Sequence, residues 1–88
     1  MKSPILLVDD DPSFCQFVRI GLQEDYLITI SHDLKGLFAF LEKARFDILL
    51  LDVGLGEENG IESIRNINSK YNNLDIIMVS GYKDPGKI

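Results

Sequence analysis

The sequence contains a single cysteine, Cys15, among its 88 residues. One cysteine excludes an intrachain disulfide and is typical of proteins from a reducing compartment. Long apolar runs are also missing, so no segment has the roughly 20 residues of a membrane-spanning helix. The N-terminus lacks the apolar core of a signal peptide. We therefore expect a cytoplasmic protein with no membrane partner, in which Cys15 is buried or half-buried rather than reactive.

An excess of positive charge is absent as well. The chain has 9 Lys and Arg residues against 14 Asp and Glu residues, which gives a net charge of -5. Phosphate contacts need clustered basic side chains, so this balance argues against a nucleic-acid surface in the segment and suits a cation site. The composition, 45% hydrophobic and 26% charged, is that of a globular chain. The length predicts one small domain over residues 1–88.

Short apolar runs alternate with segments of helical periodicity. The apolar runs predict four strands, at residues 5–8, 26–30, 48–51 and 75–80. Apolar stripes between them predict three helices, on Phe14, Phe17, Val18, Gly21 and Leu22, on Leu34, Leu37, Phe38 and Leu41, and on Ile61, Ile64 and Ile67. Asp11 and Asp33 precede the first two helices and are good N-caps.

Strands that alternate with helices predict an α/β fold built on a doubly wound parallel sheet. Right-handed crossovers restrict its layout. If the second and third strands flank the first, the strand order is 2-1-3-4. The first helix then covers one face and the other two cover the opposite face. Sheets of this kind bind ligands beyond the carboxyl ends of the strands, where the strand order reverses.

Aspartates follow the two strands at that reversal. Asp9 and Asp10 come after the first strand, and Asp52 comes after the third. Two carboxylates ~4 Å apart repel by ~4 kcal/mol at an effective dielectric constant near 20, so such a cluster takes up a proton or binds a cation. Oxygen ligands of this type favour Mg²⁺. We expect a magnesium site on these three residues.

Two further polar residues lie at strand ends. Ser80 ends the fourth strand, where its hydroxyl can donate a hydrogen bond to a group attached to Asp52. His32, the only histidine, follows the second strand, and we expect it to be a surface residue.

Together these residues resemble the receiver domain of two-component response regulators. Leu6 to Pro12 is similar to the first strand and acidic pair of that family. Leu51 to Gly60 is similar to its phosphorylation loop, and Ile76 to Gly81 to its fourth strand and switch hydroxyl. The resemblance implies a flavodoxin-like (CheY-like) fold.

The resemblance also implies roles for individual residues. Asp52 would accept a phosphoryl group from a phosphohistidine on a sensor histidine kinase or phosphotransfer protein, which makes the chain a signalling domain rather than an enzyme. Asp10, Asp52 and the Gly54 carbonyl would bind Mg²⁺ directly, and Asp9 would bind it through water. Ser80 would be the switch hydroxyl.

The sequence departs from the family pattern in two ways. Gly56 stands where the family usually has proline. The chain also stops soon after the fourth strand, so the family's final helix, strand and helix are missing from it. Neither Lys83 nor Tyr82 takes the place of the lysine and aromatic residue that those elements carry. An apolar fourth strand at the sheet edge tends to pair with another chain, so we expect self-association there.

Three other functions compete with phosphoacceptance. A hydrolase with an aspartyl-phosphate intermediate would want a second acid at position 54, which is glycine. A flavin or nucleotide carrier would want a loop rich in Gly, Ser or Thr after the first strand, where this chain has Asp9 to Pro12. A non-phosphorylatable fragment that acts only through self-association or protein interaction stays open as the main alternative.

Overall fold

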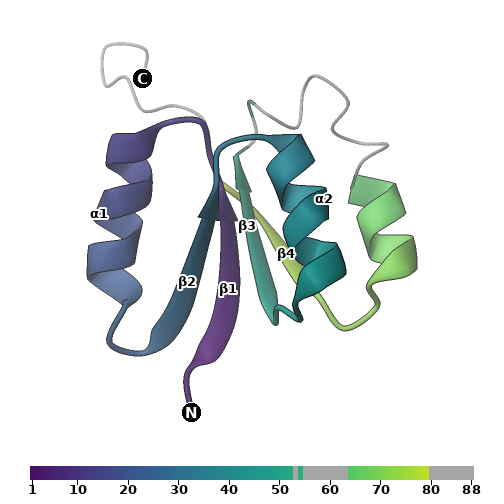
Figure 1. Ribbon diagram of the computed structural model, residues 1–88, viewed down its shortest axis with the longest axis horizontal. Coiled ribbons are helices and arrows are strands. Elements are labelled where there is room, and N and C mark those ends of the chain that lie inside the picture. The colour runs from purple at the N-terminus through teal and green to yellow at the C-terminus, as the bar shows by residue number, and fades with distance from the viewer. Residues whose placement is uncertain (53, 55–63, 80–88) are drawn as a thin grey trace.

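The computed structural model describes residues 1–52, 54 and 64–79, and its strands form one four-stranded parallel sheet. Its labelled elements are β1 (Ser3–Val8), α1 (Pro12–Leu22), β2 (Tyr26–Ser31), α2 (Leu34–Lys43), β3 (Ile48–Asp52) and β4 (Asp75–Val79). Residues 64–70 are also helical. The strand order is β2-β1-β3-β4 (Figure 1), which confirms the predicted fold class and topology. Within the described part of the chain, no helix is long and apolar enough to cross a bilayer.

The register brings the carboxyl ends of β1 and β3 side by side. Val8, the last residue of β1, pairs with Ser31 of β2 on one side and with Leu51 of β3 on the other. An aspartate follows each member of the Val8–Leu51 pair. Asp9 comes directly after β1, and Asp52 is still within β3. Asp52 was expected just beyond the third strand, but its pairing with Val79 makes it the last residue of β3.

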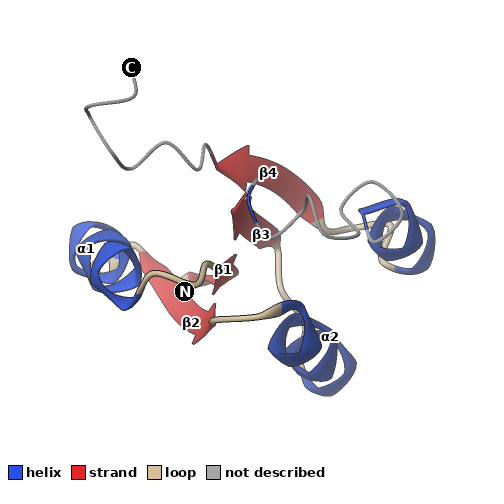
Figure 2. Ribbon diagram, turned by 90° about the horizontal axis from the view of Figure 1, so that it is seen from above, coloured by secondary structure: helices blue, strands red, loops and turns tan. Residues whose placement is uncertain are grey.

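The helices lie on opposite faces of the sheet (Figure 2). Seen from above, α1 covers one face near β2, whereas α2 and the helical residues 64–70 cover the other. This is the arrangement that right-handed crossovers require for the strand order 2-1-3-4. We call these the α1 face and the α2 face.

The principal hydrophobic core lies on the α2 face. Alternate residues of β1 and β3 point toward this face, because side chains along a strand alternate between its two sides. They pack with buried residues of α2, of the helical segment and of the connecting loops. The members of this core are Leu6, Val8, Leu37, Leu41, Phe46, Leu49, Leu51, Ile67 and Leu74.

The α1 face has a smaller buried set. Ile5, Leu7 and Cys15 are buried there, so the expectation for the cysteine is confirmed. The predicted stripe of α1 is wrong at Phe17, which is 75% exposed. With 100° of rotation per residue, a helix that turns Cys15 toward the sheet turns Phe17 away from it.

The α2 stripe also differs from the prediction at one position. The spacing predicts Phe38 on the apolar stripe, yet 37% of it is exposed. Phe40, which the predicted stripe does not include, is partly buried and packs against the core. Leu37 and Phe40 are three residues apart and share a face, whereas Phe38 lies one residue beyond Leu37 and is rotated toward solvent.

The third predicted helix is described only in part. Ile67 is buried and Ile64 is partly buried against the core, as its stripe predicts. Ile61 and the tail at 81–88 lie outside the described residues.

Candidate metal centre at the carboxyl end of the sheet

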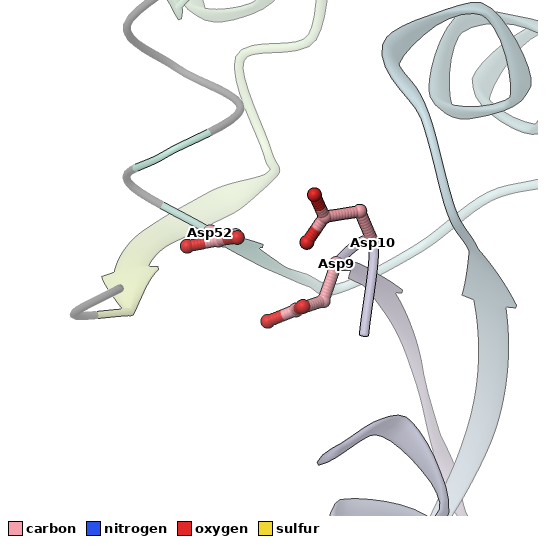
Figure 3. A group of neighbouring side chains, drawn as sticks. All are labelled: Asp9, Asp10 and Asp52. Atoms are coloured by element: carbon pink, nitrogen blue, oxygen red, sulfur yellow. The ribbon is translucent and has the colours of Figure 1, made fainter. Parts of the chain in front are cut away.

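The structure brings together the three aspartates that the sequence singled out. Asp9, Asp10 and Asp52 each offer one carboxylate oxygen, and these oxygens lie within 4.8 Å of one another. Figure 3 shows the three side chains gathered beside the end of β3. Their proximity follows from the parallel register, since β1 and β3 end at the same level in the sheet.

Asp9 is the most tightly held of the three and is fully buried. Its N–H donates to the Ser31 carbonyl at 3.0 Å, which extends the β1–β2 pairing by one residue. Its Oδ1 accepts the Asp11 N–H at 2.9 Å. Its own carbonyl lies 3.6 Å from the Cys15 Sγ, a weak donor on α1. Both the backbone and the carboxylate of Asp9 are therefore fixed by neighbouring elements.

Asp52 is also buried, with 5% of its surface exposed. Its Oδ1 accepts the Gly54 N–H at 3.1 Å, which holds the plane of the carboxylate. A Cβ at Gly54 would lie 3.6 Å from the nearest Asp52 oxygen, an ordinary contact, so space alone does not require glycine here.

The other two aspartates of the first loop have different surroundings. Asp10 is exposed and completes the cluster from the solvent side. Asp11 accepts the N–H groups of Ser13 at 3.0 Å and Phe14 at 3.4 Å, so it is the N-cap of α1, as predicted.

One residue at this end of the sheet was not connected with the cluster by sequence reasoning. His32 is exposed, as expected, but its Nδ1 lies 3.0 Å from the Asp9 carbonyl oxygen. The available signal was its position directly after β2, the strand that pairs with β1.

The electrostatics of this cluster favour a cation. Two unit charges 4.8 Å apart, the widest spread of the three oxygens, repel by roughly 3 kcal/mol at an effective dielectric constant near 20. Mg²⁺ binds oxygens at ~2.1 Å, so oxygens on opposite sides of the ion are ~4.2 Å apart. A spread of up to 4.8 Å is compatible with two direct carboxylate ligands and a third that binds through water. The donor set thus fits Mg²⁺.

Three sequence-based expectations for the site lie beyond what the structure places. Ser80 and Gly56 are outside the described residues. Gly54 is described and donates its N–H to Asp52, but its carbonyl as a metal ligand stays a prediction.

The fold and the acidic cluster agree with a comparison against protein families. The model of the response regulator receiver domain matches residues 5–88. The chain belongs to this family.

Individual relatives support the assignment. The chain is 33% identical over 64 residues to the transcriptional regulatory protein TrcR of Mycobacterium tuberculosis. The aligned region covers 72% of this chain and 25% of TrcR. The chemotaxis response regulator CheY4 of Vibrio cholerae is 30% identical, with a TM-score of 0.81 over 99% of this chain and 75% of CheY4. TrrA of Thermotoga maritima, solved in complex with Mg²⁺-BeF, is 27% identical, with a TM-score of 0.80 over 94% of this chain and 72% of TrrA. The chain therefore spans a quarter of TrcR but about three quarters of the two solved structures.

Membership places the chain among the signalling domains of two-component systems, which are not enzymes in the usual sense. Receiver domains bind Mg²⁺ at an acidic site, and this chain assembles such a cluster. Domains of this family interact with sensor histidine kinases or phosphotransfer proteins.

Proposed function

We propose that this receiver domain accepts a phosphoryl group on Asp52 from a phosphohistidine partner, with Mg²⁺ held by the aspartate cluster. The observation that supports this most strongly is the convergence of three carboxylate oxygens within 4.8 Å at the end of β1 and β3. Asp52 is the residue of the three that lies on the central strand beside β1 and next to β4.

Asp52 is the nucleophile in this proposal. One of its carboxylate oxygens attacks the phosphorus of the phosphohistidine, the phosphorus–nitrogen bond breaks, and the imidazole of the partner leaves with the electron pair. The product is an acyl phosphate on Asp52. The Gly54 N–H at 3.1 Å holds the carboxylate in one orientation, which reduces the entropy lost on reaching the attacking geometry.

Asp9 and Asp10 serve the reaction by holding the ion. Asp10 and Asp52 are proposed as direct ligands with the Gly54 carbonyl, and the buried Asp9 as a ligand through water. When bound, Mg²⁺ supplies neutralisation of the charge on the transferring phosphoryl oxygens. Ser80 is proposed as the hydroxyl that turns toward the phosphoryl group afterward.

The main alternative, a fragment that acts only through association, is not favoured. A chain without phosphoacceptor function gains nothing from placing two buried aspartates and a third carboxylate together, because their mutual repulsion lowers stability. Such an arrangement marks a functional site more often than a structural one.

The test is phosphorylation by a small donor. The purified chain is incubated with Mg²⁺ and acetyl phosphate, and its intact mass is measured over time. We expect a single phosphoryl adduct on the wild type and none on Asp52→Asn. An adduct that persists in Asp52→Asn would refute Asp52 as the acceptor.

The Asp9 to Asp11 run provides a matched control. Asp10→Asn removes a proposed ligand, and we expect it to abolish both Mg²⁺ binding and the adduct. Asp11→Asn makes the same chemical change one residue away, but Asn is an equally good N-cap. Asp11→Asn is therefore expected to bind Mg²⁺ and form the adduct like the wild type.

We also propose self-association through the edge of β4. Among the described strands β4 has a neighbour on one side only, and two of its apolar residues are exposed, Ile77 by 50% and Met78 by 40%. An exposed apolar edge offers both unpaired backbone groups and hydrophobic surface to a second copy.

Light scattering at micromolar concentration tests this second proposal. We expect an average mass above that of the monomer. We expect Ile77→Lys to shift the mass to that of the monomer, because a charged side chain on an edge strand opposes its pairing with a second copy. Phe38→Lys, a substitution at a similarly exposed residue on α2, is expected to leave the mass unchanged. A wild type that stays monomeric would contradict the proposal.

A further inference from the structure

The Asp9 carbonyl is held by a side chain from the segment directly after β2, rather than from either strand of the acidic cluster. The His32 Nδ1 lies 3.0 Å from this oxygen. A carbonyl oxygen can only accept a hydrogen bond, so the bond requires the proton of the ring to be on Nδ1. The contact therefore assigns both the partner and the tautomer of His32.

The backbone of His32 is anchored on both sides. Before it, the Ser31 carbonyl accepts the Asp9 N–H at 3.0 Å. After it, Asp33 caps α2 by accepting the Gly36 N–H at 2.7 Å, and the Ser31 hydroxyl donates to the Asp33 carbonyl at 2.9 Å. The ring thus projects from a fixed point, and its donor reaches the Asp9 carbonyl at an ordinary hydrogen-bond distance.

The peptide that carries this carbonyl joins Asp9 to Asp10. Its oxygen accepts the hydrogen bond from the His32 ring and lies 3.6 Å from the Cys15 Sγ. Orienting this peptide sets the direction in which the chain leaves β1, and hence where the Asp10 side chain starts. Asp10 is exposed, so the backbone before it contributes more to its placement than packing does.

We propose that His32 is a positioning residue for the metal centre, which acts by fixing the Asp9–Asp10 peptide through its Nδ1–H. It touches neither the phosphoryl group nor the ion, and it is not a catalytic residue. The inference rests on the proposed function, since it assumes that the aspartate cluster binds Mg²⁺. The segment directly after β2 therefore contributes to the metal centre through His32, which the three aspartates alone do not reveal.

Two amide substitutions separate this role from a general structural one. The Nδ2 of asparagine sits at the same distance from the backbone as the histidine Nδ1, whereas the glutamine Nε2 corresponds to the far ring nitrogen. His32→Asn therefore keeps a donor where the Asp9 carbonyl needs it, and His32→Gln moves the donor away. His32→Ala removes it.

The experiment measures the affinity for Mg²⁺ alone by isothermal titration calorimetry. We expect His32→Ala and His32→Gln to weaken binding by about three- to tenfold, as loss of one orienting hydrogen bond does. We expect His32→Asn to stay within about twofold of the wild type. Urea unfolding of the metal-free variants provides the control. A merely structural role would lower the free energy of unfolding but would give His32→Asn and His32→Gln the same affinity for Mg²⁺.

A second readout does not depend on the metal. Nitrogen-15 spectra of the imidazole in the metal-free wild type are expected to show the proton on Nδ1. A ring protonated on Nε2 alone would overturn the inference, as would equal Mg²⁺ affinity in all three variants and the wild type. A wild type that does not bind Mg²⁺ at all would overturn the metal site itself together with this inference, so the two failures are distinguishable.

Discussion

The α2 face of the sheet and the carboxyl end of the same strands have opposite effects on stability. On the α2 face, residues such as Leu6, Leu37 and Leu49 are completely buried in contact with apolar neighbours. At the carboxyl end, two strands bring buried carboxylates together, with Asp9 at 0% and Asp52 at 5% exposure. The apolar face stabilises the folded state because it excludes water from apolar side chains. The carboxyl end destabilises it because like charges repel one another. The difference indicates that burial on the apolar face offsets the repulsion within the acidic cluster.

The first prediction, and the largest effect, concerns the apolar face. Leu49→Ala is expected to lower the free energy of unfolding by ~3 kcal/mol, because it removes a fully buried side chain from the core. Leu50 is the next residue of β3, faces the α1 side and is only partly buried. Leu50→Ala is expected to cost roughly 1 to 2 kcal/mol. Urea unfolding followed by circular dichroism measures both, and equal losses would remove the distinction between the two faces.

The second prediction concerns Mg²⁺ as a stabiliser of the acidic end. An ion that binds the folded chain alone adds stability by mass action, ~2.7 kcal/mol at a concentration one hundred times its Kd. We expect this gain in the wild type and in Asp11→Asn. The gain is expected to disappear in Asp10→Asn and on addition of a chelator. Thermal unfolding with and without Mg²⁺ measures it, and a gain that survives in Asp10→Asn would place the ion elsewhere.

The third and smallest effect is the cost of the cluster without its ion. In a metal-free buffer, Asp52→Asn is expected to raise the free energy of unfolding by ~1 kcal/mol, because it removes one of the repelling charges. The asparagine oxygen can still accept the Gly54 N–H. Asp11→Asn lies outside the cluster and is expected to leave stability unchanged. A loss of stability in Asp52→Asn would mean that the carboxylate stabilises the fold even without a cation.

The sequence predicted the acidic cluster because the relevant signals are local. Asp9, Asp10 and Asp52 each end an apolar run, and a parallel sheet with this strand order places such ends together. His32 was missed as a contact of Asp9 because its partner is 23 residues away and the bond is made by a single ring nitrogen. The periodicity of a sequence does not predict which atom of a surface side chain forms a hydrogen bond with a particular carbonyl.

The helix faces show a similar division. The existence and order of α1 and α2 follow from their caps and spacing, yet Phe17 and Phe38 are exposed and Phe40 packs against the core. Each stripe contained more apolar residues than its helix could turn toward the sheet. The residues that each helix buries are therefore few, Cys15 on α1 and Leu37 with Leu41 on α2.

The sequence by itself determined the α/β class, the strand order and the three acids, because alternation of apolar runs, crossover handedness and strand ends depend on neighbouring residues and simple geometry. The tertiary structure decided which aspartate is buried, which phenylalanines face solvent and which residue orients the Asp9 carbonyl. These outcomes depend on the angles at which helices and loops pack on the sheet, and packing angles arise from many distant contacts at once rather than from any one segment.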